Sequence, residues 1–140
     1  MESRLSLVLR NQISELEKLS EGVSAWCREN GVSTAAEFHL HLALDEIVSN
    51  VIRYGWKDDG EHQIRVRLSR LEDELTVEVE DDAMPFNPLD VPMADLDRPL
   101  EERPIGGLGI YLVRHIMDSL EYRRLEGKNL LIMKKKTDGT

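Results

Sequence analysis

Two polar residues stand out because of their types and their spacing. Glu46 and Asn50 are four residues apart, so in a helix they lie on one face, one turn from each other. An apolar stripe runs beside them at helical spacing, formed by Leu40, Leu44, Ile47 and Val51. A carboxylate can accept a proton, and an amide oxygen suits a hard cation. The pair therefore indicates a site at the edge of the core, although a solvated helix side gives the same pattern.

A further carboxylate, Asp81, ends a segment in which apolar and polar residues alternate as in a strand. Burying an unpaired carboxylate is costly, so Asp81 is expected either to meet a hydrogen-bond donor or simply to begin a turn. The exocyclic amine of a nucleotide base is one such donor. The adjacent Asp82 is interpreted as the turn residue.

Three glycines, Gly106, Gly107 and Gly109, stand where an apolar helix is predicted to begin. The first turn of a helix has free N–H groups and the positive end of the helix dipole, and a phosphate fits there. Glycine also lets the backbone come close to such a ligand. A phosphate site is therefore favoured over a purely structural turn.

The stretch from 83 to 105 contains all five prolines of the chain and shows neither a helical nor a strand period. A loop of this length inside a compact domain is usually functional or disordered. Together with its flanking motifs, the segment is interpreted as a nucleotide lid over about residues 83–107, and a plain flexible insertion is the alternative.

The remaining periodicities predict a sheet with helices on one face. Alternation predicts strands over residues 4–10 and 62–70, a third from 75 to 80, and a closing hairpin from 122–126 and 129–134. Helical spacing predicts helices over residues 11–30, about 34–54 and 106–120. We expect one domain over residues 1–140, an α/β two-layer sandwich whose mixed, mostly antiparallel sheet is covered on one face by about three helices.

Several finer expectations concern the ends and faces of these helices. The first helix is predicted to carry Ile13 on its core face. Ser33 or Thr34 is expected to cap the second helix, with Glu37, three residues after Thr34, completing a capping box. The third is expected to place Leu112 and Leu120 in its core stripe, with Val113, Ile116 and Met117. The lysine-rich end, 134–137, is expected to be solvated.

Composition narrows the function classes. The net charge of −9 argues against a general nucleic-acid-binding surface and against binding to anionic membranes. No apolar run is long enough to span a bilayer, and the N-terminus lacks a signal-peptide pattern. The single cysteine, Cys27, cannot form an internal disulfide and is interpreted as a core or rim residue. A cytoplasmic protein is therefore expected.

Taken in order, three motifs resemble the ATP-binding fold of the gyrase, Hsp90, histidine-kinase and MutL superfamily, also called the Bergerat fold. They are Glu-x-x-x-Asn-x-x-x-Tyr-Gly at 46–55, Asp-Asp-x-x-Pro-Phe-Asn-Pro at 81–88 and Gly-Gly-Leu-Gly at 106–109. The residues of these motifs and the short length of the chain are most similar to those of the anti-sigma-factor serine/threonine kinases. The resemblance covers nearly the whole chain.

The resemblance implies a role for each matching residue. It makes Glu46 the general base, Asn50 the Mg²⁺ ligand and Asp81 the acceptor of the adenine amine. The remaining nucleotide-binding positions that it implies are Ala83, Pro85, Phe86, Gly106, Gly107, Leu108 and Gly109. One position departs from the family pattern, because Ala83 stands where glycine is usual, and its methyl group could crowd the base.

The implied function is that of a kinase which uses Mg-ATP to phosphorylate a serine or threonine of an antagonist protein. In the same partner-switching logic it binds a sigma factor and so regulates transcription. A homodimer with no direct contact to nucleic acid is also expected. The alternative is a nucleotide-binding module that sequesters a partner with little catalysis. The ATP-binding domain of a histidine kinase is disfavoured, since no long heptad helix pair precedes the domain.

The remaining polar residues give weaker signals. A cation for the γ-phosphate could come from Arg53, Lys57, Arg98, Arg103 or Arg114. His39 shares the helical flank of Glu46 and Asn50 and is expected to face solvent. The other histidines show no metal-site spacing with Cys27 or with each other.

Overall fold

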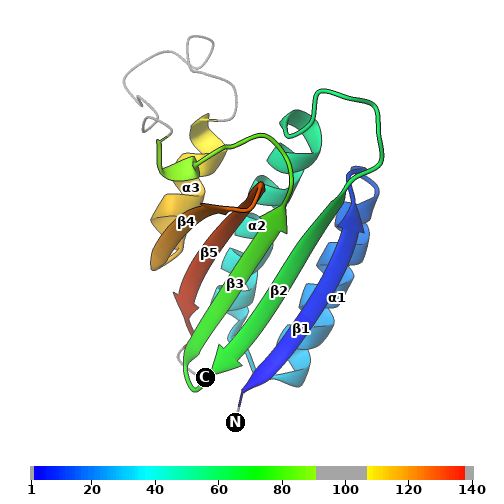
Figure 1. The fold of residues 1–140 in the computed structure, drawn as a ribbon. Helices are drawn as coiled ribbons and strands as arrows, with labels where there is room; N and C mark the ends of the chain where they lie inside the picture. The colour runs from blue at the N-terminus through cyan, green and yellow to red at the C-terminus, as the bar shows by residue number, and fades with distance from the viewer. Residues whose placement is uncertain (1, 91–106, 138–140) are drawn as a thin grey trace.

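The computed structural model describes residues 2–90 and 107–137, and the fold is the expected two-layer sandwich (Figure 1). The elements are β1 (Ser3–Arg10), α1 (Glu15–Glu29), α2 (Thr34–Tyr54), β2 (Gln63–Leu71), β3 (Glu74–Asp81), the 3₁₀ helix η1 (Pro88–Asp90), α3 (Gly107–Ile116), β4 (Ser119–Leu125) and β5 (Lys128–Lys136). The strand order is β1-β2-β3-β5-β4, and each neighbouring pair is antiparallel. β3 is thus the central strand.

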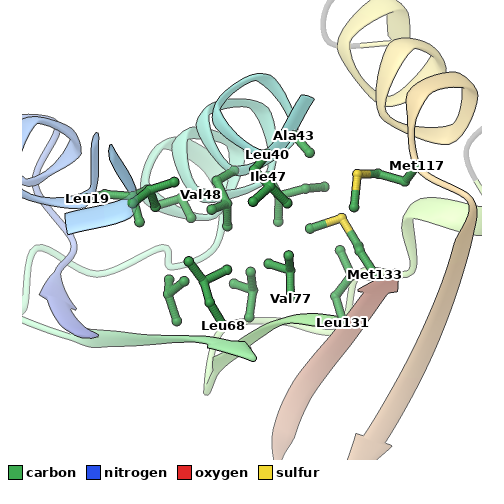
Figure 2. Close-up of a cluster of buried hydrophobic side chains, with 14 of the residues drawn as sticks. Leu19, Leu40, Ala43, Ile47, Val48, Leu68, Val77, Met117, Leu131 and Met133 are labelled. Carbon is green, nitrogen blue, oxygen red and sulfur yellow. The ribbon is translucent and has the colours of Figure 1, made fainter. Parts of the chain in front are cut away.

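The core lies between the sheet and the helices, as the alternation of apolar residues predicts. Ile64, Val66 and Leu68 of β2 are buried, and their partners across the ladder on β3 are Asp81, Val79 and Val77. Figure 2 shows side chains of α2, including Leu40 and Ile47, packed above those of the sheet. The other sheet face is polar: Arg67 lies 3.4 Å from Glu78 and 3.7 Å from Glu80.

The start of α1 differs from the sequence prediction. The helix begins at Glu15, and Ile13 lies in the preceding turn with 45% of its surface exposed. Backbone bonds from Gln12 N to Arg10 O and from Glu15 N to Gln12 O close this turn, so the apolar period of the helix does not extend back to Ile13. The predicted end is confirmed: Asn30 caps the helix and Gly31 follows with φ of +63°.

The start of α2 is capped by Ser33, whose hydroxyl accepts a hydrogen bond from Ala36 N at 3.2 Å. The capping box expected between Thr34 and Glu37 is not formed. Thr34 is already the first helical residue, and the Glu37 carboxylate lies 3.2 Å from Nε2 of His41, one turn further along the helix. Gly55 ends the helix as predicted.

The last third of the chain also corrects two expectations. α3 ends at Ile116, so Leu120 belongs to β4, and Leu112 is 37% exposed while Ile110 and Val113 face the core. The lysine-rich end is not a solvated tail, because β5 pairs with β3 as far as Lys136. Among the described helices, none is both long and apolar enough to cross a membrane.

Candidate functional site

A cavity of about 330 Å³ opens at the carboxyl end of β3, beside the C-terminal half of α2. Its walls come from α2, from β3 and the loop after it, from α3, and from the strands β4 and β5. They are mostly apolar, with a few polar groups. The lining residues are Ile47, Asn50, Val51, Tyr54, Gly55, Val79, Asp81, Ala83, Met84, Pro85, Phe86, Pro88, Ile110, Tyr122, Asn129 and Leu131. Size and composition are those of a small-molecule site.

One wall of the cavity is a face of α2. Ile47, Asn50, Val51 and Tyr54 recur at helical spacing along it, and all four line the cavity. Asn50 is only partly buried, so its amide borders the space rather than the core. Of the two polar residues on the predicted helical flank, Asn50 therefore borders a cavity.

Glu46 lies one turn before Asn50 and faces Gly109 of α3. A methyl group added at Gly109 would lie 2.0 Å from the Glu46 carboxylate oxygen Oε2 and 2.8 Å from Cδ. The glycine therefore leaves the space that the carboxylate occupies. Glu46 and Gly109 belong to different sequence motifs and are 63 residues apart in the chain, and the fold places them side by side.

Asp81 forms a buried polar end of the cavity, with 6% of its surface exposed. Its Oδ1 accepts hydrogen bonds from Ala83 N at 3.0 Å and from Asn129 Nδ2 at 2.9 Å. Burial raises the pKa of Asp81, and the Asn129 and Ala83 donors oppose that rise. The bonds to the Asp81 side chain within the described residues end on Oδ1, which leaves Oδ2 for a donor in the cavity.

Sequence reasoning did not identify Asn129 as a site residue. It is the ladder partner of Asp81 across β3 and β5, and it is equally buried at 6% exposure. The only local signal was an amide in line with Leu131 and Met133, at the buried positions of the alternating strand. That it meets Asp81 depends on strand register, which the local pattern does not contain.

Ala83, the departure from the family pattern, is 3% exposed and lies against Gly55. A methyl group added at Gly55 would come within 2.8 Å of the Ala83 Cβ and 2.5 Å of the Val51 carbonyl oxygen. Met84 N also donates to the Gly55 carbonyl at 3.0 Å. The Ala83 methyl is therefore accommodated by the missing side chain of Gly55, and the cavity stays open beside it.

The loop that follows contributes Pro85 and Phe86, two of the predicted nucleotide-binding residues, to the lining of the cavity. Phe86 is 48% exposed, and its backbone N–H donates to Asn129 Oδ1 at 3.4 Å. Asn87 caps η1 through a bond from Leu89 N to its Oδ1 at 2.9 Å. This part of the predicted lid is thus tied to the sheet.

The other residues predicted for the site either fall outside the described residues or do not line the cavity. Gly106, Arg98 and Arg103 fall outside the described residues, as does the predicted lid from residue 91 to 106. Gly107 is the first residue of α3, which confirms that a helix begins within the glycine motif, and Leu108 follows it. Arg53 and Lys57 are exposed near the C-terminal end of α2, and Arg114 is half-buried on α3.

The remaining predictions concern His39, Cys27 and metals. His39 does not simply face solvent: its Nδ1 is buried and has no hydrogen-bond partner in the described chain, and burial lowers its pKa. Burial raises the pKa of Cys27 to about 12, which agrees with a core residue. Within residues 2–90 and 107–137, no cluster of three or more His, Cys, Asp or Glu side chains could hold a metal.

Curated relatives are similar to this chain in sequence. Serine-protein kinase RsbW of Bacillus mycoides is 31% identical over 100 residues, which are 68% of this chain and 61% of that protein. Serine/threonine-protein kinase BtrW of Bordetella bronchiseptica is 28% identical over 101 residues, or 72% of this chain and 71% of that protein. The chain thus spans only about three fifths of the length of the RsbW relative.

A solved structure shares the fold. The RsbU and RsbW domains of a Mycobacterium tuberculosis protein match 96% of this chain and 32% of their own, with a TM-score of 0.68 at 14% identity. The family described as the histidine kinase-like ATPase domain matches residues 9–135. That match includes Glu46, Asn50, Asp81 and the glycine motif, and the chain therefore belongs to the histidine kinase-like ATPase domain family.

Proposed function

We propose that the cavity binds Mg-ATP and that the chain transfers the γ-phosphate to a serine or threonine of a partner protein. The observation that carries the nucleotide part is Asp81, a buried carboxylate at the end of an apolar cavity with one oxygen left for a ligand. A flat base with an exocyclic amine would donate a hydrogen bond to this oxygen and pack against the apolar walls. The site is one that adenine fits.

The other end of the site has the groups for phosphoryl transfer. Asn50 borders the cavity with an amide oxygen, which suits a cation that takes its other ligands from water and phosphates. A bound Mg²⁺ would neutralise charge on the phosphates. The first turn of α3, which begins at Gly107, is close enough to Glu46 to bring its backbone N–H groups to the same place.

Glu46 is the proposed general base. Its carboxylate takes the proton from the serine or threonine hydroxyl as that oxygen forms its bond to the γ-phosphorus and the bond to the β-phosphate oxygen breaks. The products are a phosphorylated partner and ADP. Positioning by α2 and α3 supplies most of the remaining catalysis, since phosphoryl transfer requires little covalent help.

The partners are proposed from similarity to RsbW and BtrW, which are named as serine and serine/threonine kinases. We expect an antagonist protein as the phosphoryl acceptor and a sigma factor as the binding partner, with the chain acting as a homodimer in the cytoplasm. The acidic net charge of −9 favours a basic contact surface on the partner.

Calorimetric titration with ATP, in the presence and absence of Mg²⁺, tests the nucleotide part. Binding that requires Mg²⁺ and weakens in Asp81→Asn would support it. Incubation with ATP and an antagonist domain of this family, followed by mass spectrometry of that domain, tests transfer. Tight Mg-ATP binding without any phosphorylated product would favour a sequestering module, and no binding in either condition would contradict the proposal.

A further inference from the structure

The buried side chain of Asn129, on β5, forms hydrogen bonds through both its Nδ2 and its Oδ1. Its Nδ2 lies 2.9 Å from Asp81 Oδ1, 3.0 Å from the Met84 carbonyl oxygen and 3.3 Å from that of Ala83. Its Oδ1 accepts from the Tyr122 hydroxyl and from Phe86 N. A single buried side chain thus joins β3, β4 and the loop that forms the opposite wall of the cavity.

The partners of Asn129 settle which way its amide points. Carbonyl and carboxylate oxygens can only accept, and the Phe86 backbone N–H can only donate. Turning the amide round would place Oδ1 against three acceptors and Nδ2 against a donor. Nδ2 therefore faces Asp81, and its two N–H groups are shared among three acceptors.

This orientation decides what Asp81 can do. The Asn129 and Ala83 donors both end on Oδ1, so the carboxylate is held in one rotamer with Oδ2 as the oxygen left for the cavity. A donor at this distance also favours the ionised carboxylate, which accepts hydrogen bonds and does not donate them. Arg124 supports the same corner by donating to the Ala83 carbonyl at 2.9 Å.

We infer that Asn129 is the positioning residue that sets base specificity, by presenting Asp81 Oδ2 as an acceptor for an exocyclic amine. The inference rests on the proposed ATP site and deepens it. Without the amide, Asp81 could turn or take up a proton, and the preference for a base with an amine would be lost. Asn129 itself does not have to touch the base.

The test compares ATP with purine riboside triphosphate, which differs from ATP only in lacking the exocyclic amine. By calorimetry, the full chain should bind ATP at least about tenfold more tightly than the analogue, because only ATP can donate a hydrogen bond to the charged carboxylate. In Asn129→Leu, which has a similar volume, the ratio should fall towards one through weaker ATP binding. Lys128→Ala, at the exposed neighbouring position, is the matched control and should keep the ratio.

A structural role would give a different result. If Asn129 only held the loop in place, Asn129→Leu would weaken both nucleotides equally, and the unchanged ratio would overturn the inference. If Asn129→Leu does not fold, Asn129→Asp is used instead, since it keeps the side-chain shape but replaces the donor by a second carboxylate. It should also lose the preference for ATP over the analogue.

A ligand-free measurement separates this inference from the proposed function. Carbon-13 NMR of the Asp81 carboxyl should show a higher pKa in Asn129→Leu than in the unmodified chain, since a donor to the carboxylate is gone. An unchanged pKa would overturn the positioning role even if ATP binds. Failure of the unmodified chain to bind either nucleotide would instead overturn the proposed function, whatever the titration shows.

Discussion

The two ends of the cavity are built in different ways. At the end proposed for the base, which we call the base end, the Asp81 carboxylate and the Asn129 amide are buried and held by hydrogen bonds from strands and loop. At the end proposed for the phosphates, which we call the phosphate end, no hydrogen bond within the described part of the chain holds the Asn50 amide or the Glu46 carboxylate, although Glu46 lies against Gly109. The base end is thus preformed, and the phosphate end has groups free to bind an ion or a substrate.

This difference predicts how variants will behave. Changes at a preformed end alter affinity and base preference, because the binding geometry is already fixed before the ligand arrives. Changes at the freer end alter the rate of transfer, because their groups meet their partners only in the reacting complex. A variant at one end that showed the effect expected for the other end would contradict this distinction.

The largest effect is expected for Glu46→Gln. The amide keeps the shape of the side chain but cannot accept the hydroxyl proton, so transfer to an antagonist domain should fall by about 10²-fold or more. ATP affinity by calorimetry should stay within about threefold, since Glu46 does not line the cavity. Asp45→Asn, at the exposed acidic neighbour, is the control and should transfer normally. Normal transfer by Glu46→Gln would remove the base assignment.

Asp81→Asn tests the base end. The amide oxygen can keep the bonds from Ala83 N and Asn129 Nδ2, so its N–H₂ group takes the place of Oδ2 and faces the ligand. ATP should bind about tenfold more weakly or worse, while ITP, with a carbonyl in place of the amine, should gain relative to ATP. Paired calorimetric titrations measure this. An unchanged ratio of ATP to ITP affinity would show that Asp81 does not read the base.

The same variant makes a prediction about stability and pH. Burial raises the pKa of Asp81 in the folded protein above its ordinary value, so the folded state holds this proton more tightly than the unfolded chain. The contribution to stability is therefore present below the unfolded pKa of about 3.9 and lost as pH rises through the folded pKa. Asp81→Asn should accordingly gain thermal stability relative to the unmodified chain as pH rises from 4 towards 7. A lower melting temperature at pH 7 would mean that the hydrogen bonds of the carboxylate outweigh its burial.

The comparison also shows what the sequence could predict. The residues of the proposed phosphate end could be identified from local spacing, because Glu46 and Asn50 are one helical turn apart and the glycine motif opens α3. The sheet and its inward residues followed from alternation. The Asn129 network was missed because it depends on which residue of β5 stands opposite Asp81 and which of β4 lies beside it. Such pairings are non-local and have no sequence period.

The errors at element ends have the same origin. Ile13 continues the apolar spacing of α1, but the turn after β1 decides where that helix begins. Leu120 continues the spacing of α3, but pairing with Met133 draws it into β4. In both cases hydrogen bonding at or beside a strand decides where the helix begins or ends. It outweighs one further apolar residue at helical spacing.

Gly109→Ala should lower transfer without lowering stability. The added methyl would occupy the place of the Glu46 carboxylate, which is the flexible end of its side chain and can move aside. We expect transfer to fall about tenfold because the Glu46 carboxylate is no longer aligned. Stability should rise by up to about 1 kcal/mol because alanine has a better helix propensity than glycine. Gly22→Ala in α1 gives the same propensity change far from the motifs and should leave transfer unchanged. If Gly109→Ala transfers normally, the contact with Glu46 has no part in catalysis.

The smallest functional effect is expected for Ala83→Gly, which restores the residue usual in the family. The methyl is buried against Gly55 and the cavity is open beside it, so ATP affinity should change by less than about threefold. Stability should fall by about 1–2 kcal/mol, from one lost buried methyl group and the greater freedom of glycine in the unfolded chain. Urea unfolding and calorimetry measure the two quantities separately. A tenfold gain in ATP affinity would show that the methyl does crowd the base, and that the base end still has to adjust when a nucleotide binds.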